Sequence, residues 1–472
     1  MMNLQKNPLI CLVSATMMLF AFRTLLVDVR GATTTSSSVL LTKHHSPLHS
    51  FRDGGGSEWS VEKIYRTLQV QIVHRHGDRT PITPMKDEDY WSATLVPSPL
   101  LEKISSNTNV VVPDGSPNTH VAGGRGAFGK LTKLGLFQLV DLGTMLREEL
   151  VSSLSHRDPD AYEMMSHPTD STSRHWYYRY PWTPERPLHP NNIKIISTNF
   201  PRTIQSVQGL LVGLFPDGTS DDVIQIDASH TDILIPDPQP RRSEEQTKLE
   251  ITLAQQPHLK ERELEMRPLA IRTTAALLDA LGEGAWDANF GVGEDKEADT
   301  TTSNQQPRLS WSQLAEITKC LQVRNLLPPS ITQEDQETIS EYTAWRWFQS
   351  LRHPRMAYLA MQPMMSRIVK AMHHYEKEPP VIVYSAHDST LIGLLCGFRL
   401  EQPSVWPEYG SYIKIELLEV ETVGQEEKEH VVRFSLNGSL LRSLWDKDRP
   451  QVEIPLRHLD HRIKTEGAVA AS

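Results

Sequence analysis

The stretch Leu68-Gln-Val-Gln-Ile-Val-His-Arg-His-Gly-Asp-Arg-Thr-Pro81 decides the fold, because a strand-like run leads directly into a polar cluster. Leu68, Val70 and Ile72 alternate with glutamines, and this period of two predicts a β-strand over residues 67–73. The cluster that follows holds two imidazoles and two guanidiniums and stops at Pro81. In a chain with a formal net charge of −10, such a local concentration of basic groups stands out as a candidate site.

The same sequence of strand, polar turn and helix recurs twice further along the chain. Residues 193–196 predict a strand that runs into a polar turn and then a helix, and residues 381–384 predict another. Strands that alternate with helices predict a mostly parallel sheet, and ligands bind beyond the carboxyl ends of its strands. We therefore expect three turns to converge on one pocket, namely residues 74–81, 197–203 and 385–390.

The wider pattern divides the chain into a core and an insertion. Residues 61–239 and 346–460 predict an α/β core, in which a mostly parallel sheet is flanked by helices. Residues 240–345 are helical in pattern and charged, which predicts a helical cap inserted into that core. We expect a disordered loop at the acidic stretch 293–307 and a disordered tail at 461–472.

Local signals refine the core. Residues 82–128 show little periodicity, so we expect a long loop over the site. Leucines at helical spacing from Leu131 to Leu146 predict a helix that Thr132 can cap. Asn437-Gly438 follows a strand-like run and predicts a hairpin turn.

The N-terminus has the composition of a targeting segment. Lys6 precedes an apolar run from Leu9 to Phe22, and a Ser-, Thr- and Gly-rich flexible linker covers residues 32–60. We expect residues 1–31 to send the chain to the secretory pathway or the cell exterior, either cleaved or kept as a membrane anchor. A low content of acids together with several arginines leaves a mitochondrial presequence as the alternative.

Composition excludes other classes of protein. A hydrophobic content of 39% and a charged content of 22% are typical of a soluble globular chain, and the negative net charge argues against a nucleic-acid partner. Three cysteines without a CxxC spacing exclude a disulfide framework. Cys320 and Cys396 could pair, but we expect two buried free thiols.

The residue types at the three turns suit chemistry on a phosphoryl group. Arg75, Arg79 and Arg202 together offer planar, permanently charged donors for its oxygens. His76 lies beside these arginines and is expected to stay neutral, because nearby positive charge disfavours the imidazolium. A neutral imidazole is a competent nucleophile towards phosphorus.

The turn at 385–390 supplies the complementary groups. Asp388 can protonate the leaving alkoxide as a general acid, and His387 can donate to a phosphoryl oxygen. This assembly needs no metal and no other cofactor. A metal site built from the histidines and Asp78 is the alternative, and we expect the arginines to disfavour it by repelling a cation.

The stretch Arg75-His76-Gly77-Asp78-Arg79-Thr80-Pro81 resembles the RHGxRxP signature of the histidine acid phosphatases, and His387-Asp388 resembles the HD pair of that family. The helix pattern that follows this signature in the family is matched by Leu131-Thr132, Gly135, Gln138 and Leu142-Gly143. The resemblance covers residues 65–445 and implies an α/β core with a helical cap and a phosphohistidine intermediate. It also implies roles for six residues: His76 as nucleophile, Asp388 as proton donor, and Arg75, Arg79, Arg202 and His387 as phosphate ligands.

Within this family, Ser197-Thr198-Asn199, Gly213-Leu-Phe215 and Trp406-Pro407 are similar to the lysophosphatidic acid phosphatases. The resemblance therefore makes a lysophospholipid a candidate among small phosphomonoester substrates. Inositol phosphates and phosphorylated sugars are alternatives, although the cap mixes Glu with Arg and Lys rather than being strongly basic. A catalytically dead phosphate-binding module is a further alternative, against which the presence of both His76 and Asp388 argues.

Overall fold

The computed structural model describes residues 63–112, 124–152, 177–179, 188–218, 222–236, 243–287, 308–401, 404–422, 427–446 and 449–469. The predicted targeting segment at 1–31, the linker at 32–60 and the acidic cap stretch at 293–307 lie outside these ranges. Among the helices within them, none has the length and apolar character that a membrane span requires.

A mixed sheet of ten strands organises the described part of the chain, in the order β10-β8-β7-β1-β6-β4-β5-β2, with β3 beside β1 and β9 beside β8. One half is parallel and consists of β1 (Lys63–Arg75), β2 (Thr108–Val111), β3 (Tyr177–Arg179), β4 (Ile193–Ser197), β5 (Ile224–Asp227) and β6 (Val381–Ala386). The other half is antiparallel and consists of β7 (Tyr412–Thr422), β8 (Lys428–Leu436), β9 (Ser439–Leu440) and β10 (Ile454–Pro455). The predicted α/β fold with a flanked sheet is confirmed, and its antiparallel half makes the sheet mixed.

The central strand β1 is covered on both faces. Val70 and Ile72 belong to the apolar cluster formed with α4 (Lys133–Ser152) and α6 (Pro201–Leu214). On the opposite face, the buried Gln71 donates a hydrogen bond of 3.0 Å to the backbone carbonyl of Ile368 in α12 (Pro354–His373). The glutamines that produce the alternating pattern are therefore buried and hydrogen-bonded rather than exposed to water.

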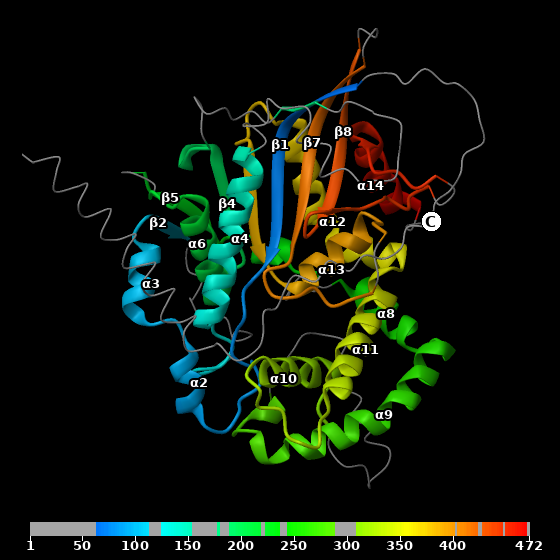
Figure 1. Cartoon of the computed structure of the whole chain (residues 1–472). Coiled ribbons are helices and arrows are strands. Elements are labelled where there is room, and N and C mark those ends of the chain that lie inside the picture. Colours follow the sequence, from blue (N-terminus) through cyan, green and yellow to red (C-terminus); the bar gives the residue numbers. More distant parts are fainter. Residues whose placement is uncertain are drawn as a thin grey trace, which may run out of the picture. The chain divides into compact units, whose positions relative to one another are not determined.

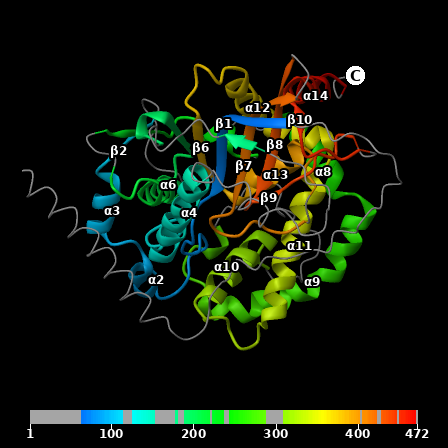
Figure 2. The same ribbon diagram turned by 45° about the horizontal axis from the view of Figure 1, so that its top comes forward.

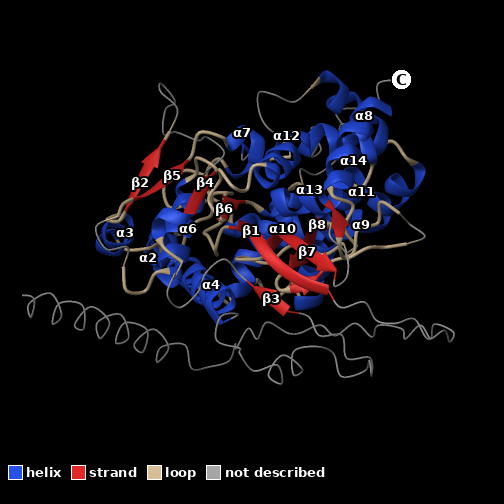
Figure 3. Cartoon of the chain, turned by 90° about the horizontal axis from the view of Figure 1, so that it is seen from above, coloured by secondary structure: helices blue, strands red, loops and turns tan. Residues whose placement is uncertain are grey.

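Helices cover the sheet in two layers, which Figure 3 shows from above. The layer of α4 and α6 packs on one face, with α3 (Ser98–Ser105) against α6. The other layer consists of α12, α13 (Asp388–Gly397) and α14 (Leu456–Val469), whose apolar side chains form the largest cluster with the second face. Figure 2 shows α4 and α6 apart from α12 and α13, with the strands between them.

The region 240–345 is helical, and its helices share an apolar cluster with Met85, Trp91 and Phe128 of the segment that follows β1. It contains α8 (Glu244–Ala254), α9 (Pro257–Leu277), α10 (Trp311–Val323) and α11 (Gln333–Leu351), after the single turn α7 (Thr231–Leu234). In Figure 1, α9, α10 and α11 lie below the end of β1, so the cap stands at the carboxyl ends of the parallel strands. Short 3₁₀ turns occur at η2 (Pro190–Asn192), η3 (Leu278–Ala280) and η4 (Ala285–Asp287).

Two expectations of irregular structure are wrong. The predicted loop at 82–128 contains α2 (Glu88–Thr94), α3 and β2, although residues 113–123 lie outside the described ranges. These elements are too short to repeat an apolar pattern, and α2 depends on a local cap in which Asp87 accepts from the Tyr90 backbone N–H at 3.2 Å. The predicted tail from 461 is largely helix α14, because Leu459 and Ile463 pack against the cluster around α12.

Other local predictions are confirmed. Helix α4 starts after Thr132, whose hydroxyl accepts from the Gly135 backbone N–H at 3.1 Å. Asn437 and Gly438 both have positive φ, 49° and 84°, as a two-residue hairpin turn requires. Cys320 and Cys396 are buried free thiols.

Candidate active site

The three polar turns come together at the carboxyl ends of β1, β4 and β6, as predicted. The His76 backbone N–H donates to the Ala386 carbonyl at 3.1 Å, and the Thr198 backbone N–H donates to the Ser385 carbonyl at 3.0 Å. The Ser385 hydroxyl donates to the Thr203 carbonyl at 2.8 Å. Because β6 lies between β1 and β4, these bonds continue the sheet's own pairing into the turns and hold their side chains together.

The imidazole of His76 is buried, with 2% of the residue exposed, and has a defined orientation. Its Nδ1 lies 2.8 Å from the Gly77 carbonyl oxygen. A carbonyl can only accept, so Nδ1 carries the hydrogen and, in the neutral ring, Nε2 carries the lone pair. Burial and the positive charges of Arg202 and Arg75 lower the pKa of His76 well below 6.5, which keeps the ring neutral.

Gly77 explains how the turn reaches this position. A Cβ atom there would stand 2.1 Å from the backbone oxygen of Gly135 in α4, so only glycine permits the close approach. The Gly77 backbone N–H also donates to the Ser206 hydroxyl of α6 at 3.1 Å. The nucleophile candidate is therefore held between two helices of the core.

Arg75 connects β1 to the turn that follows β6. Its Nη2 lies 2.7 Å from Asp388 Oδ2, its Nη1 donates to the Pro407 carbonyl at 2.5 Å, and its guanidinium stacks 4.1 Å from the centre of the Tyr409 ring. Asp388 Oδ2 also accepts from the Trp406 indole N–H at 3.1 Å. The carboxylate is thus held by two donors from separate parts of the chain.

These contacts affect the protonation of Asp388. Burial alone raises the pKa of this carboxyl, but Arg75, His387 and Arg79 outweigh it and hold the pKa below 3.8. Asp388 is consequently ionised in the ligand-free protein at mildly acidic pH. If Asp388 is the proton donor, as predicted, ligand binding has to raise its pKa.

Arg79 and Arg202 differ in their counter-charges. Arg79 Nη1 donates to Glu316 Oε2 at 2.7 Å, whereas Arg202 donates to the Gly129 carbonyl at 3.4 Å and lies 4.6 Å from the centre of the Phe200 ring. No carboxylate of the described residues forms an ion pair with Arg202. Burial and the charge of Arg79 lower the pKa of Arg202 to about 9, because a second cation nearby disfavours its charge.

The arginines share a further property. The Nε–H groups of Arg75, Arg79 and Arg202 are all buried, and none has a hydrogen-bond partner among the described residues. Arg202 also lies in the first turn of α6, where the helix dipole favours an anion. Buried donors and a cation without an ion-pair partner among the described residues together define a site for a compact anion.

His387 bridges two of the turns. Its Nε2 lies 3.0 Å from the Thr198 hydroxyl oxygen, and its ring meets the His76 ring edge-on with 5.5 Å between the ring centres. Burial and Arg202 lower the pKa of His387 well below 6.5. His387 is predicted to donate to a phosphoryl oxygen, and a donation from Nε2 would compete with its contact to Thr198.

Asp78 of the signature stretch and the adjacent His74 lie outside this group. Asp78 Oδ2 pairs with Arg324 Nη2 at 2.6 Å and accepts from the Thr132 hydroxyl at 2.5 Å. His74 is buried, with Nδ1 3.0 Å from the Arg75 carbonyl, and burial lowers the pKa of His74 to about 4. Asp78 is paired with a guanidinium, and His74 contacts a carbonyl of its own strand. Among the described residues, no group of His, Cys, Asp and Glu side chains is placed to hold a metal ion.

Sequence reasoning missed several residues of the site. Glu316 and Cys320 of α10, and Arg324 at its C-cap, lie more than 230 positions from the signature stretch and belong to no motif. Trp406 carries only the family resemblance given above, and Tyr409 belongs to no sequence pattern. A spacing of four between the α10 residues is visible in the sequence, but it is common to any helix face.

Comparison with known proteins agrees with this geometry. The family model described as "Histidine phosphatase superfamily (branch 2)" matches residues 68–263 and 294–437. Counting factor 60 of Dictyostelium discoideum is 26% identical over 78% of this chain and 79% of its own length. Lysophosphatidic acid phosphatase type 6 of Bos taurus is 22% identical over 78% of this chain and 77% of its own. Among solved structures, the apo phytase of Hafnia alvei is similar in fold, with a TM-score of 0.51 at 13% identity, covering 85% of this chain and 97% of that one.

Proposed function

This chain belongs to branch 2 of the histidine phosphatase superfamily and is a phosphomonoester hydrolase, and we propose that its reaction passes through a phosphohistidine at His76. The observation that carries the proposal is the Nδ1 hydrogen bond to Gly77, which leaves the Nε2 lone pair available in a neutral ring. In the first step, Nε2 attacks phosphorus and the ester P–O bond breaks. In the second, water attacks phosphorus, the P–N bond breaks, and its electron pair returns to Nε2.

The side chains of Arg75, Arg79 and Arg202 stabilise the negative charge that develops on the phosphoryl oxygens. Arg202 is the strongest candidate, because the phosphoryl group would supply the ion-pair partner that this buried cation lacks among the described residues. Arg75 and Arg79 add the donors that remain free on their Nε atoms. Each charge-assisted hydrogen bond of this kind contributes roughly 1.5–3 kcal/mol.

Asp388 gives the leaving alkoxide a proton in the first step and takes one from water in the second. In the free protein its carboxylate is bound to Arg75, which keeps it ionised. A bound phosphoryl group draws on the same positive charge, so we expect the pKa of Asp388 to rise in the substrate complex. Low pH then favours the protonated donor, which predicts the highest turnover at mildly acidic pH.

For the substrate, we propose a lysophospholipid phosphate such as lysophosphatidate. The relatives named for this activity support it, and so does the charge pattern of α10. The α10 cations Lys319 and Arg324 are already paired with Glu408 and Asp78, so these two offer no free charge to a second phosphate. Competition between lysophosphatidate and inositol hexakisphosphate tests this choice, and preferential hydrolysis of the inositol compound would reverse it.

Hydrolysis of p-nitrophenyl phosphate by His76→Ala tests the central step. We expect no measurable turnover, and we expect full turnover in His373→Ala, which changes an exposed histidine of α12 as a control. A His76→Ala variant that retains activity would refute the nucleophile assignment. A wild-type protein that binds phosphate but forms no product would instead indicate a phosphate-binding module.

A further inference from the structure

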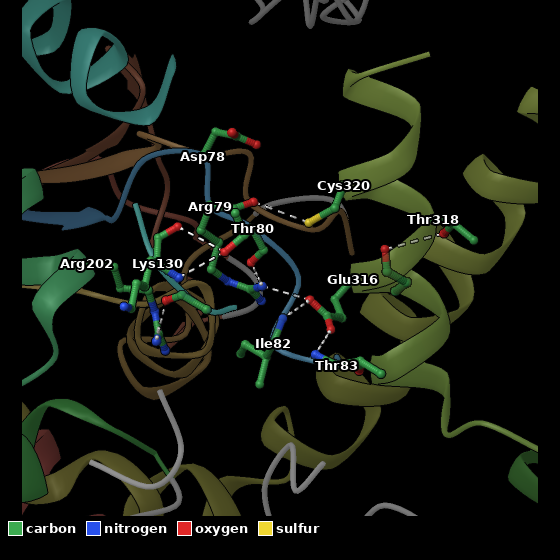
Figure 4. A network of polar contacts seen from close by, with 12 residues as sticks. Asp78, Arg79, Thr80, Ile82, Thr83, Lys130, Arg202, Glu316, Thr318 and Cys320 are labelled. Carbon is green, nitrogen blue, oxygen red and sulfur yellow. Dashed lines mark hydrogen bonds and ion pairs between the residues drawn. The ribbon is translucent and has the colours of Figure 1, made fainter. Parts of the chain in front are cut away.

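Helix α10 of the cap presents one face to the turn that carries His76. Glu316, Cys320 and Arg324 are four residues apart and so lie on the same side of the helix. Arg324 Nη2 pairs with Asp78 Oδ2 at 2.6 Å, and the Cys320 thiol donates to the Arg79 carbonyl at 3.4 Å. Figure 4 shows Glu316 and Cys320 reaching from the helix towards the turn. Side chains of the cap therefore bind directly to the turn that carries His76.

Glu316 is the best anchored of the three. Its Oε1 accepts from the Thr83 backbone N–H at 2.9 Å, and its Oε2 accepts from the Ile82 backbone N–H at 3.1 Å. These two bonds fix the carboxylate independently of any side chain on the turn, and only 8% of the Glu316 side chain is exposed. The third bond, from Arg79 Nη1 to Oε2 at 2.7 Å, then holds the guanidinium against a carboxylate that is already fixed (Figure 4).

From this geometry we propose that Glu316 is a positioning residue of the phosphate site, which holds Arg79 so that its remaining donors meet the phosphoryl group. The inference rests on the proposed function, in which Arg79 binds phosphate. Nη1 is occupied by Glu316 and the Thr80 carbonyl, while the buried Nε–H has no partner among the described residues. The carboxylate thus selects which edge of the guanidinium stays available. Glu316 itself does not touch the substrate.

A carboxylate beside a phosphate site has two opposite effects, and they can be told apart. As a negative charge, Glu316 weakens the binding of an anion, so its removal would tighten phosphate binding. As a positioning group, it prevents Arg79 from adopting other rotamers, so its removal would weaken phosphate binding. The sign of the change in phosphate affinity therefore decides between the two roles.

The test is calorimetric titration of inorganic phosphate into the wild type and Glu316→Gln. We expect about tenfold weaker binding in the variant, the loss of one well-placed charged hydrogen bond. Glu416→Gln is the matched control, because Glu416 is equally buried, with 8% of its side chain exposed, and is ion-paired with Lys414 on β7. We expect unchanged phosphate affinity in that control. Tighter or unchanged binding in Glu316→Gln would overturn the positioning role.

Two further variants separate position from charge and from folding. Glu316→Asp keeps the charge but withdraws the carboxylate by one methylene, so we expect weaker phosphate binding and a raised KM with a smaller change in kcat. In an Arg79→Ala background, Glu316→Gln should cause no additional loss, because it acts through that arginine. An additional loss of full size would show a role in supporting the turn only, and would contradict the inference.

The outcomes also separate this inference from the proposed function. A wild type that neither binds phosphate nor hydrolyses p-nitrophenyl phosphate would refute the function itself. A wild type that does both, with unchanged phosphate affinity in Glu316→Gln and Glu316→Asp, would refute the role of Glu316 alone. Thermal unfolding of each variant beside Glu416→Gln checks that the comparison is made between folded proteins.

Discussion

The buried arginines Arg202 and Arg79, on opposite sides of the candidate active site, differ in whether they have an ion-pair partner. On the core side, Arg202 is 5% exposed and has no carboxylate partner among the described residues. On the cap side, Arg79 pairs with Glu316 and Arg324 pairs with Asp78. A buried charge without a partner destabilises the fold, whereas a paired one is largely compensated. Arg202 therefore marks where the ligand supplies the charge, and the two cap-side pairs mark where the cap is attached. Arg75, also on the core side, is paired with Asp388 of the site itself.

The largest effect should come from Arg202→Met. Losing this cation removes charged contacts to the phosphoryl group, so we expect kcat/KM for p-nitrophenyl phosphate to fall by roughly two to three orders of magnitude. The free energy of unfolding should stay the same or increase, because the fold no longer buries an uncompensated charge. Loss of activity together with a clear loss of stability would show that Arg202 is structural after all.

Arg324→Met should show the opposite pattern. It leaves the fully buried Asp78 without its ion-pair partner, and removing one partner of a buried pair costs about 3–5 kcal/mol of unfolding free energy. Urea denaturation measures this loss. The control is Lys464→Met, which breaks the exposed pair with Asp460 and should change stability by about 0.5 kcal/mol or less. Equal losses of stability in the two variants would contradict the distinction between the buried ion pair that attaches the cap and an exposed surface pair.

A smaller effect is expected from Trp406→Phe, which removes the indole donor to Asp388. Losing this bond disfavours the carboxylate, so the pKa of Asp388 should rise towards its ordinary value. Because the proton donor must be protonated, the fall of kcat with increasing pH should move to higher pH by about half a unit. A shift to lower pH would argue that Asp388 does not act as the donor.

The smallest effect is expected at Cys320, the uncharged member of the α10 face. Burial raises the pKa of its thiol to about 12, so it stays neutral and contributes only a weak bond to the Arg79 carbonyl. For Cys320→Ala we expect kcat/KM within about twofold of the wild type and a loss of roughly 1 kcal/mol in stability. A large loss of activity would mean that the whole face, rather than Glu316, positions the turn.

This contrast also explains how far the sequence could be interpreted. The core side was predictable because strand periodicity and turn chemistry are local, and parallel strands bring their carboxyl ends to one edge. His76, Arg202 and Asp388 could therefore be placed together without knowing the structure. Their predicted chemical roles stay predictions until the variants are measured.

The cap side could not be predicted in the same way. Nothing in the sequence around Glu316 or Arg324 indicates which of many charged helix positions meets the turn at 78–83, because that depends on how the cap packs. The pKa of Asp388 depends on Arg75 and Arg79 in the same non-local manner. The capped element α2 was missed because its seven residues are too few to repeat an apolar pattern, and α14 was missed because few of its residues are apolar.

The most direct test is to locate the phosphoryl group during turnover. The enzyme is mixed with p-nitrophenyl phosphate, quenched in alkali, which preserves phosphohistidine, and mapped by mass spectrometry and phosphorus NMR. Because Nδ1 donates to the Gly77 carbonyl, we expect the phosphoryl group on Nε2 of His76. A phosphoryl group on Nδ1, or on any other residue, would contradict this mechanism.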